Sequence, residues 1–367
     1  MVDSTGSFTL DPKKAEEKLR NFSFASPDHY LLKVVQCAVA GGAETVEIKT
    51  GATRISIQFG GEAMSCETVS GMVGYLLSAE IPLKDRRFRH LAAGLRGAAG
   101  CSPDGIIFDF WTGDSNFQRV WDEQGWRQTA VQKTSGFHQF ILVRTWGQTM
   151  TSASQEVLGV LSSRDTTEEA LLRKHCLYAP CKLTLDGETL PESGFGKARY
   201  PGYDIFSDPN PGESRPPRYL EAGTLIDGFM VGEHHLVEKF IPGSAERPGC
   251  LPLPDSQATL RDDSAGPGLQ GGWLALTAVL GTPRIVYVED GVVIEEEEAD
   301  DIPIPGLFAV LSAVGLQKDL TGFQLVRDQA FHDLRVLAIE EAVAMKRRVL
   351  ENLPLFPNRE RIQEALN

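Results

Sequence analysis

Apolar residues recur along the first half of the chain with two different spacings. Where they return every three or four residues, the pattern predicts helices over 12–22, 27–40, 65–77 and 166–178. Where they alternate with polar residues or form short runs, the pattern predicts strands over 45–50, 54–59, 105–112, 118–122, 126–132, 137–145 and 181–185. The Asp186-Gly187 pair after the last strand is typical of a tight turn.

The second half of the chain begins after a change in composition. Residues 191–218 are rich in Pro, Gly, Ser, Asn and Asp without periodicity, which indicates a linker between two domains, 1–190 and 219–367. Beyond the linker, the pattern predicts strands over 223–238, a loop over 242–272, apolar segments over 273–280 and 284–288, a short strand over 291–294, and helices over 305–315 and 329–352. The acidic run 295–301 is interpreted as a solvated loop, with a cation site as the alternative.

Composition and charge limit the class of protein. The chain has 367 residues, 42% of them hydrophobic, and a net charge of −14 from 50 acidic and 36 basic side chains. This balance is typical of a folded, soluble protein and argues against binding to nucleic acid or to an anionic membrane surface. Neither an apolar signal core nor a membrane-spanning run is present, and the six cysteines form no CxxC pair. We therefore expect a cytoplasmic protein with reduced thiols.

Three glycine-containing segments stand at the ends of predicted elements. The helix over 27–40 ends at Gly41-Gly42 and runs into the first strand. The second strand runs through Gln58 into Gly60-Gly61 and a Met64-Ser65 helix start. The third segment, Ala93-Gly94-Leu95-Arg96-Gly97-Ala98-Ala99-Gly100, precedes the later strands.

This order of segments resembles the GHKL ATPase superfamily, which includes gyrase, heat-shock protein 90, histidine kinases and MutL. In that family the helix carries an acidic base and a Mg²⁺-binding Asn, an Asp after the second strand holds the adenine, and a glycine-rich lid cradles the phosphates. The resemblance places Lys33 at the base, Cys37 at the Asn and Gln58 at the adenine Asp. None of the three side chains retains the family's chemistry.

Later segments are similar to the heat-shock-protein-90 chaperones in particular. Val120-Trp121-Asp122-Glu123-Gln124-Gly125 resembles the family's W-E-S-x-G, and Tyr178-Ala179-Pro180 resembles the start of its middle domain. Residues 315–328 resemble the segment whose Arg reaches the ATP γ-phosphate, and the matching residue is Arg327. The resemblance implies an α+β fold, with a Bergerat-type α/β sandwich followed by a smaller middle-domain-like α/β domain. A C-terminal dimerisation domain is not expected, because the chain stops at Asn367.

Two interpretations of the pocket follow from these exchanges. Lys33 cannot act as a carboxylate base. Near phosphates, however, its positive charge could replace Mg²⁺, so that Lys33 and the backbone N–H groups of 94–100 would bind an anion or a nucleotide such as ATP without a metal ion. The alternative is a vestigial pocket in which Lys33 is a surface residue, Arg96 an ion-pair partner, Arg327 structural and Cys37 part of the core. The candidate binding residues are Lys33, Gln36, Cys37, Gln58, Gly60, Gly61, Gly94, Arg96 and Gly97.

Three functions are compatible with the sequence. The first is a non-hydrolysing, chaperone-like interaction scaffold that binds a protein partner or forms part of a larger assembly, without a cofactor. The second is an active chaperone-like ATPase whose base comes from Glu44, Glu47 or Glu62. The third is a MutL-like module associated with nucleic acid, suggested by Gly94-Leu95-Arg96-Gly97 and opposed by the net charge. The oligomeric state stays open.

Overall fold

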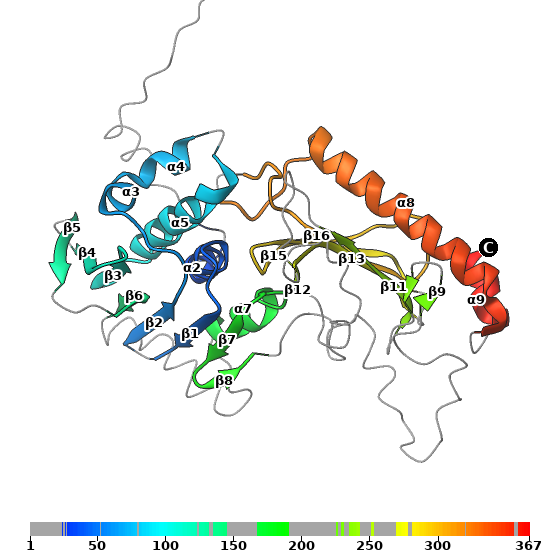
Figure 1. The fold of residues 1–367 in the computed structure, drawn as a ribbon, viewed down its shortest axis with the longest axis horizontal. Coiled ribbons are helices and arrows are strands. Elements are labelled where there is room, and N and C mark those ends of the chain that lie inside the picture. Colours follow the sequence, from blue (N-terminus) through cyan, green and yellow to red (C-terminus); the bar gives the residue numbers. More distant parts are fainter. Residues whose placement is uncertain are drawn as a thin grey trace, which may run out of the picture. The chain divides into compact units, whose positions relative to one another are not determined.

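The structure is a computed structural model. It describes residues 24–190 apart from 25, 27, 52, 79–80, 123–124, 132–134 and 145–166, the strand segments 225–226, 229–230, 235–242, 251–252 and 269–277, and residues 281–367 apart from 320 and 356–358. The fold is α+β and divides into two compact units (Figure 1). Unit 1 comprises Met1–Lys174 and Cys181–Leu190, and unit 2 comprises His175–Pro180 and Pro191–Asn367.

Unit 1 contains a mixed sheet with the strand order β5-β4-β3-β6-β2-β1-β7-β8. Neighbouring strands are antiparallel except β1 and β7, which are parallel. The strands are β1 (Thr45–Lys49), β2 (Arg54–Phe59), β3 (Gly105–Trp111), β4 (Asn116–Asp122), β5 (Gly125–Val131), β6 (His138–Val143), β7 (Lys182–Leu185) and β8 (Glu188–Thr189). The positions of the predicted strands in this half of the chain are therefore confirmed, with ends that shift by one or two residues.

Helices cover one face of this sheet (Figure 1). They are α2 (His29–Ala40), α3 (Cys66–Gly71), α4 (Val73–Leu77), the 3-10 turn η1 (Leu83–Asp85), α5 (Arg86–Gly100) and α7 (Thr167–His175). The Ser65 side chain accepts a hydrogen bond from the Thr68 N–H and so caps α3 as its position predicts. The helix predicted over 65–77 is divided at Met72, and the segment 12–22 lies outside the described residues.

The face on which α2 lies follows from ring contacts and strand register. Tyr30 of α2 packs on Phe140 of β6, with 5.8 Å between the ring centroids. Phe140 stands directly opposite Ile57 of β2, and residues opposite each other in a ladder share a face. Because side chains alternate along a strand, Ile55, Ile57 and Phe59 all point towards α2.

Unit 2 is built on a second sheet with the order β15-β14-β16-β13-β11-β10-β9, and β12 pairs with β13. Its strands are β9 (Leu225–Ile226), β10 (Phe229–Met230), β11 (His235–Pro242), β12 (Leu251–Pro252), β13 (Leu269–Thr277), β14 (Arg284–Glu289), β15 (Val292–Glu298) and β16 (Leu307–Ser312). The pairing is antiparallel except between β14 and β16.

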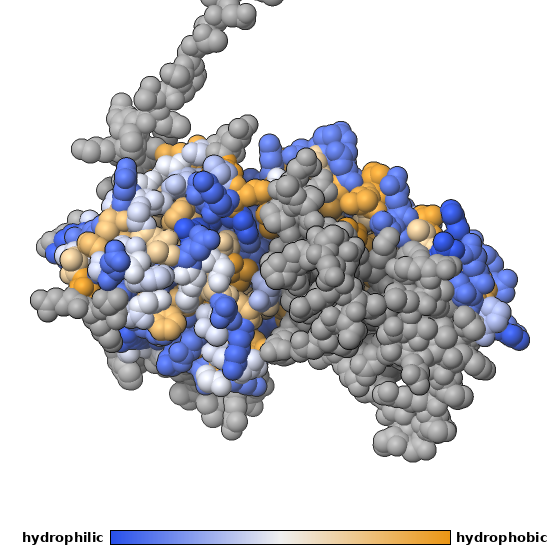
Figure 2. Space-filling model, viewed as in Figure 1, coloured by the Kyte–Doolittle hydropathy of each residue, from blue (hydrophilic) through white to orange (hydrophobic). Residues whose placement is uncertain are grey.

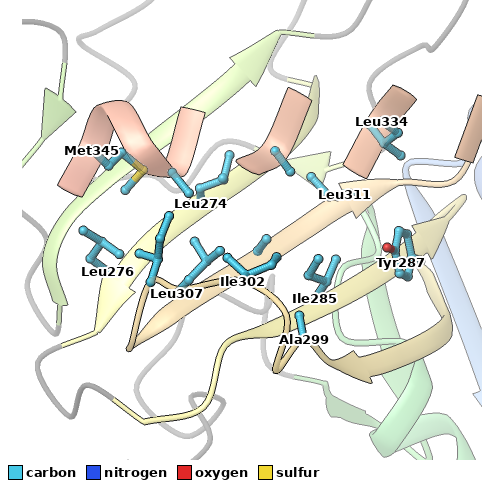
Figure 3. Packing of buried hydrophobic residues seen from close by; sticks show 14 of the residues in the cluster. Leu274, Leu276, Ile285, Tyr287, Ala299, Ile302, Leu307, Leu311, Leu334 and Met345 are labelled. Carbon is cyan, nitrogen blue, oxygen red and sulfur yellow. The ribbon is translucent and has the colours of Figure 1, made fainter. Parts of the chain in front are cut away.

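One long helix, α8 (Gln329–Glu351), supplies the other half of the core of unit 2, and the short elements η5 (Leu353–Leu355) and α9 (Arg359–Leu366) follow it. The Asp328 side chain caps α8 by accepting from the Phe331 N–H at 2.9 Å. Leu334 and Met345 of α8 face Leu311 and Leu274 of the sheet (Figure 3). Burial of this apolar stripe against the sheet holds the helix in place.

Three predictions for unit 2 are wrong in whole or in part. The predicted loop 242–272 contains β12 and the start of β13. Residues 305–315 were expected to be helical, but 307–312 form β16, which lies between β14 and β13 with all six residues buried. A short apolar run that is buried on both faces does not show a period of two, so its pattern alone does not separate strand from helix.

Residues 295–298 of the acidic run are also strand instead of loop, because β15 continues to Glu298, whereas 299–301 lie in a turn as expected. Its glutamates point alternately to the two faces, and arginines neutralise them on both. Glu296 and Glu298 pair with Arg284, and Glu295 and Glu297 pair with Arg327. Arginine side chains therefore supply the counter-charge that a bound cation would have supplied. The predicted linker 191–218 lies outside the described residues.

Truncation of α8 on its buried side should destabilise unit 2, whereas truncation on its exposed side should not. Leu334 is 4% exposed and Leu337, three residues later on the same helix, is 38% exposed. We expect Leu334→Ala to lower the free energy of unfolding by about 2–5 kcal/mol, through lost burial and a residual cavity. The control Leu337→Ala should change it by about 0.5 kcal/mol or less. Urea titration followed by circular dichroism measures both, and equal effects would contradict the packing described.

Candidate functional site

The candidate residues on α2 lie in the interior of unit 1. Lys33, Gln36 and Cys37 are all buried, with Lys33 only 2% exposed. The Lys33 Nζ donates a hydrogen bond of 2.8 Å to the Gln36 Oε1, one turn further along the helix. Lys33 is therefore not the surface residue that one interpretation expected, and its Nζ is hydrogen-bonded inside the protein.

The expected glycine-rich lid is a helix in this structure. Gly94 and Gly97 lie inside α5, where backbone N–H groups donate to carbonyls of the preceding turn. These amides are not available to cradle a phosphate. Arg96 is partly buried on the same helix.

Close packing explains the glycines of α5. A Cβ atom at Gly94 would lie 3.1 Å from the Val34 Cγ2 and 3.4 Å from the Tyr30 carbonyl oxygen, so α5 approaches the backbone of α2 at this point. A Cβ atom at Gly97 would overlap the ring of Phe24. The small residues that the sequence offered as a phosphate loop therefore serve a contact between elements.

Strand register corrects the position of the expected adenine contact. Gln58 stands opposite Gln139, so it points away from the face that α2 covers. The residue of β2 that faces inward at this level is Phe59, which is 2% exposed and packs on His138 with a centroid distance of 5.3 Å. The alternation of Ile55, Ile57 and Phe59 was the sequence signal that could have placed Phe59 correctly.

The loop that begins at Gly60-Gly61 is fastened to three neighbouring elements. The Glu62 N–H donates to the Gly41 carbonyl at 2.8 Å, and the Met64 N–H donates to the Trp111 carbonyl at 2.9 Å. The buried Arg87 of α5 donates to the Glu62 and Ala63 carbonyls at 3.3 Å each. The Glu62 and Met64 amides are thus already bonded to protein acceptors.

His138 is a member of this arrangement that sequence reasoning missed. Its Nδ1 accepts from the Trp111 N–H at 3.2 Å, so the proton is on Nε2, which donates to the Glu62 carbonyl at 3.1 Å. Burial lowers the pKa of His138 to about 4; the bond to the Glu62 carbonyl opposes this shift, and the Arg87 guanidinium adds to it. The ring is therefore neutral near pH 7 and links β6 to the loop.

The glutamates considered as substitute bases do not face α2. Glu47 stands opposite Gln58 on the other face of the sheet and pairs with Lys49 at 2.8 Å. Glu44 is exposed, and the Glu62 side chain is 74% exposed and pairs with Arg87 at 2.9 Å. The sequence of α2 itself contains no carboxylate.

Arg327 lies in unit 2 and is held there by several contacts. Its guanidinium pairs with Glu295 and Glu297 and lies over the Phe331 ring, 4.1 Å from the centroid. These contacts with Glu295, Glu297 and Phe331 support the interpretation in which Arg327 has a structural role.

A second group of titratable side chains joins the start of α2, the end of β6 and the start of α7. Arg144 donates to the Glu168 Oε1 at 2.5 Å and to the Tyr30 hydroxyl at 3.4 Å. Burial, and then the charge of Glu168, raises the pKa of Asp28, whereas Arg144 lowers it. Burial also raises the pKa of the nearby Cys101 thiol to about 11, so this cysteine is protonated near pH 7 and a poor nucleophile. The five described cysteines are free thiols.

No protein-family profile matches the chain, and no curated protein is significantly similar to it. Among the helices that the structure describes, none has the length and apolarity needed to cross a bilayer.

A side chain at Gly61 should loosen the loop, whereas one at Gly60 should not. Gly61 has a φ of +108°, and a Cβ atom there would lie 2.5 Å from the Gly41 carbonyl oxygen. We expect Gly61→Ala to lower the free energy of unfolding by about 2 kcal/mol or more, because the backbone is strained and the contact with Gly41 is pushed apart. A Cβ atom at Gly60 meets nothing within 4 Å, so Gly60→Ala is the matched control and should stay within about 0.5 kcal/mol. Chemical denaturation measures both variants.

The neutral His138 should make the stability of unit 1 depend on pH. As the pH falls from about 6.5 to about 4, the unfolded chain takes up a proton at this ring that the folded chain does not. The free energy of unfolding should therefore fall with pH, by about 3 kcal/mol from this group when the change is complete. In His138→Gln this part of the decrease should disappear. Denaturant titrations at about pH 7 and about pH 4.5 test it, and equal decreases in both proteins would contradict the assignment.

Proposed function

We propose that this protein is a non-hydrolysing, chaperone-like interaction scaffold that descends from the GHKL architecture and binds a protein partner. One observation carries the proposal. The loop 60–64, which resembles the family's adenine-binding segment, is bonded to α2, α5, β3 and β6 through its own backbone. A nucleotide would have to displace these bonds before it could bind there.

The packing beside the loop supports the same conclusion. On the helix-facing side of the sheet, the rings of Phe59, Phe108, Phe110 and His138 form a continuous group with centroid distances of 5.3 to 6.4 Å. In the resembling family a carboxylate at the end of the second strand holds the adenine; here the inward-facing residue at that end is Phe59. Aromatic rings packed on each other gain from mutual burial and offer an adenine amino group no charged acceptor.

The positions that match the catalytic residues of the resembling family also lack the groups that ATP hydrolysis needs. A water molecule must be oriented by a base, and the phosphate charge must be met by a metal ion or a cation. The α2 segment has no carboxylate, and Glu44, Glu47 and Glu62 lie at the surface or on the far face of the sheet. Arg327 is engaged by Glu295 and Glu297. These contacts favour a scaffold over an active chaperone-like ATPase.

A protein partner fits the remaining observations better than nucleic acid does. The net charge of −14 opposes association with a polyanion, so a MutL-like role gains no support from charge. An architecture that keeps its two units without its catalytic groups can still present surfaces to another protein, since a fold does not fix a function.

Nucleotide should not stabilise the protein. A ligand present at about 100 times its Kd would raise the free energy of unfolding by about 2.7 kcal/mol, which corresponds to a melting temperature several degrees higher. We expect ATP at about 5 mM, with or without Mg²⁺, to shift the melting temperature by less than about 1 °C. Differential scanning fluorimetry makes the measurement.

The variant Lys33→Met separates the two interpretations of the buried lysine. A shift that occurs without Mg²⁺ and is lost in Lys33→Met would show that Lys33 binds nucleotide and would overturn the proposal. Phosphate release above background that is lost in Arg327→Ala would establish the active ATPase instead.

A further inference from the structure

The long helix of unit 2 carries two apolar stripes, of which only one is used by the core. The first stripe packs against the sheet and consists of Phe331, Leu334, Ala338, Ala342, Met345 and Val349. The second stripe lies beside it on the helix, with a spacing of alternately three and four residues. It consists of Val336, Ile339, Val343, Lys346 and Leu350, which we call the α8 seam. In Figure 2, apolar residues interrupt the hydrophilic surface along the path of α8.

The α8 seam is open to solvent at its centre. Val336 is 52% exposed and Val343 is 41% exposed, while Ile339 and Leu350 are partly buried against the edge of the core. Branched apolar residues repeated at positions three and four apart are the pattern by which helices pair in coiled coils. The stripe is thus continuous with the core on one side and unpartnered on the other within the described part of the chain.

We infer that the α8 seam pairs with the same seam of a second copy of this chain, with the two helices antiparallel. Packed parallel and in register, the seams would bring the two Lys346 side chains together in one layer. Packed antiparallel about a two-fold axis near the middle of the seam, each Ile339 meets Val343 of the second copy, and each Lys346 lies along Val336 of the second copy. The lysine stem can cover apolar surface while its ammonium group reaches water.

Charges along the rim fit the antiparallel arrangement. Glu340 and Arg347 lie seven residues apart on the solvent side of the seam, and both are exposed. Glu340 and Arg347 each follow a seam residue by one position, so both flank the seam on the same side. In an antiparallel pair, these flanking positions of the two helices lie next to each other, and Glu340 of each copy comes near Arg347 of the other copy. The pair forms twice because a two-fold interface is self-complementary. This complementarity favours a second copy over an unrelated partner as the occupant.

The association should be weak. A seam on a single helix buries less than the approximately 1,600 Å² of a standard interface, so we expect a Kd in the micromolar range. The inference concerns unit 2 alone and does not depend on whether unit 1 binds nucleotide. A nucleotide effect on melting and a failure of self-association would therefore be distinguishable.

Sedimentation velocity of the full chain tests the inference. Between about 1 and about 200 µM, the weight-average mass should rise from the 40.2 kDa of the monomer towards twice that value. Val343→Asp, which places a charge at the centre of the seam, should raise the Kd by at least about tenfold. Leu337→Asp is the matched control: Leu337 is 38% exposed on the same helix but points to the opposite side of the core stripe, so its Kd should equal that of the parent protein.

A charge exchange tests the orientation. Glu340→Arg and Arg347→Glu should each weaken association, and the double variant should restore it. A protein that remains monomeric at about 200 µM would overturn the inference, whatever other partner it binds. A dimer that survives Val343→Asp, or that is lost equally in Leu337→Asp, would overturn it as well. Unchanged circular dichroism and melting temperature show that each exposed substitution leaves the fold intact.

Discussion

The close approach of α5 to α2 is the contact on which unit 1 depends. Glycine at position 94 lets the two backbones come together beside Val34 and Tyr30, and glycine at 97 leaves room for the Phe24 ring. With α2 held in this way, its last turn presents the Gly41 carbonyl to the Glu62 amide, and the following loop is closed onto the protein. Glycines that suggested a flexible phosphate cradle therefore produce a rigid contact between helices.

Polar groups inside unit 1 are consistent with this closed arrangement. Lys33 donates to Gln36, Arg87 donates to loop carbonyls, and His138 is neutral with both ring nitrogens bonded. Buried polar atoms cost free energy unless they are paired, and here the partners belong to the chain itself, except that the Arg87 Nε has no hydrogen-bond partner among the described residues. Groups committed to each other in this way hold elements together and have little capacity left for a ligand.

In unit 2 the features that stand out lie at the surface: the glutamates of β15 and the exposed apolar stripe of α8. The glutamates of β15 pair alternately with Arg284 and Arg327. These ion pairs offset the repulsion between like charges and allow the acidic run to form a strand. The α8 helix fills the core with one stripe and leaves the α8 seam exposed. The polar groups of unit 1 are therefore bonded inside the protein, whereas unit 2 leaves an apolar stripe of α8 partly open to solvent.

The sequence alone determined the elements whose periodicity is unambiguous: the helices 27–40 and 329–352, the strands of unit 1, and the Ser65 cap. It also determined that α2 lacks a carboxylate, since that is a matter of composition. Tertiary structure decided the rest. Whether 307–312 is a strand or a helix depended on neighbours on both faces, and the acidic run became a strand because arginines distant in sequence neutralise it. The inward-facing residue was Phe59 and not Gln58, and His138 joined the loop 60–64 from a strand about 75 residues away. Partners brought together only by folding cannot be read from the local pattern that each segment carries.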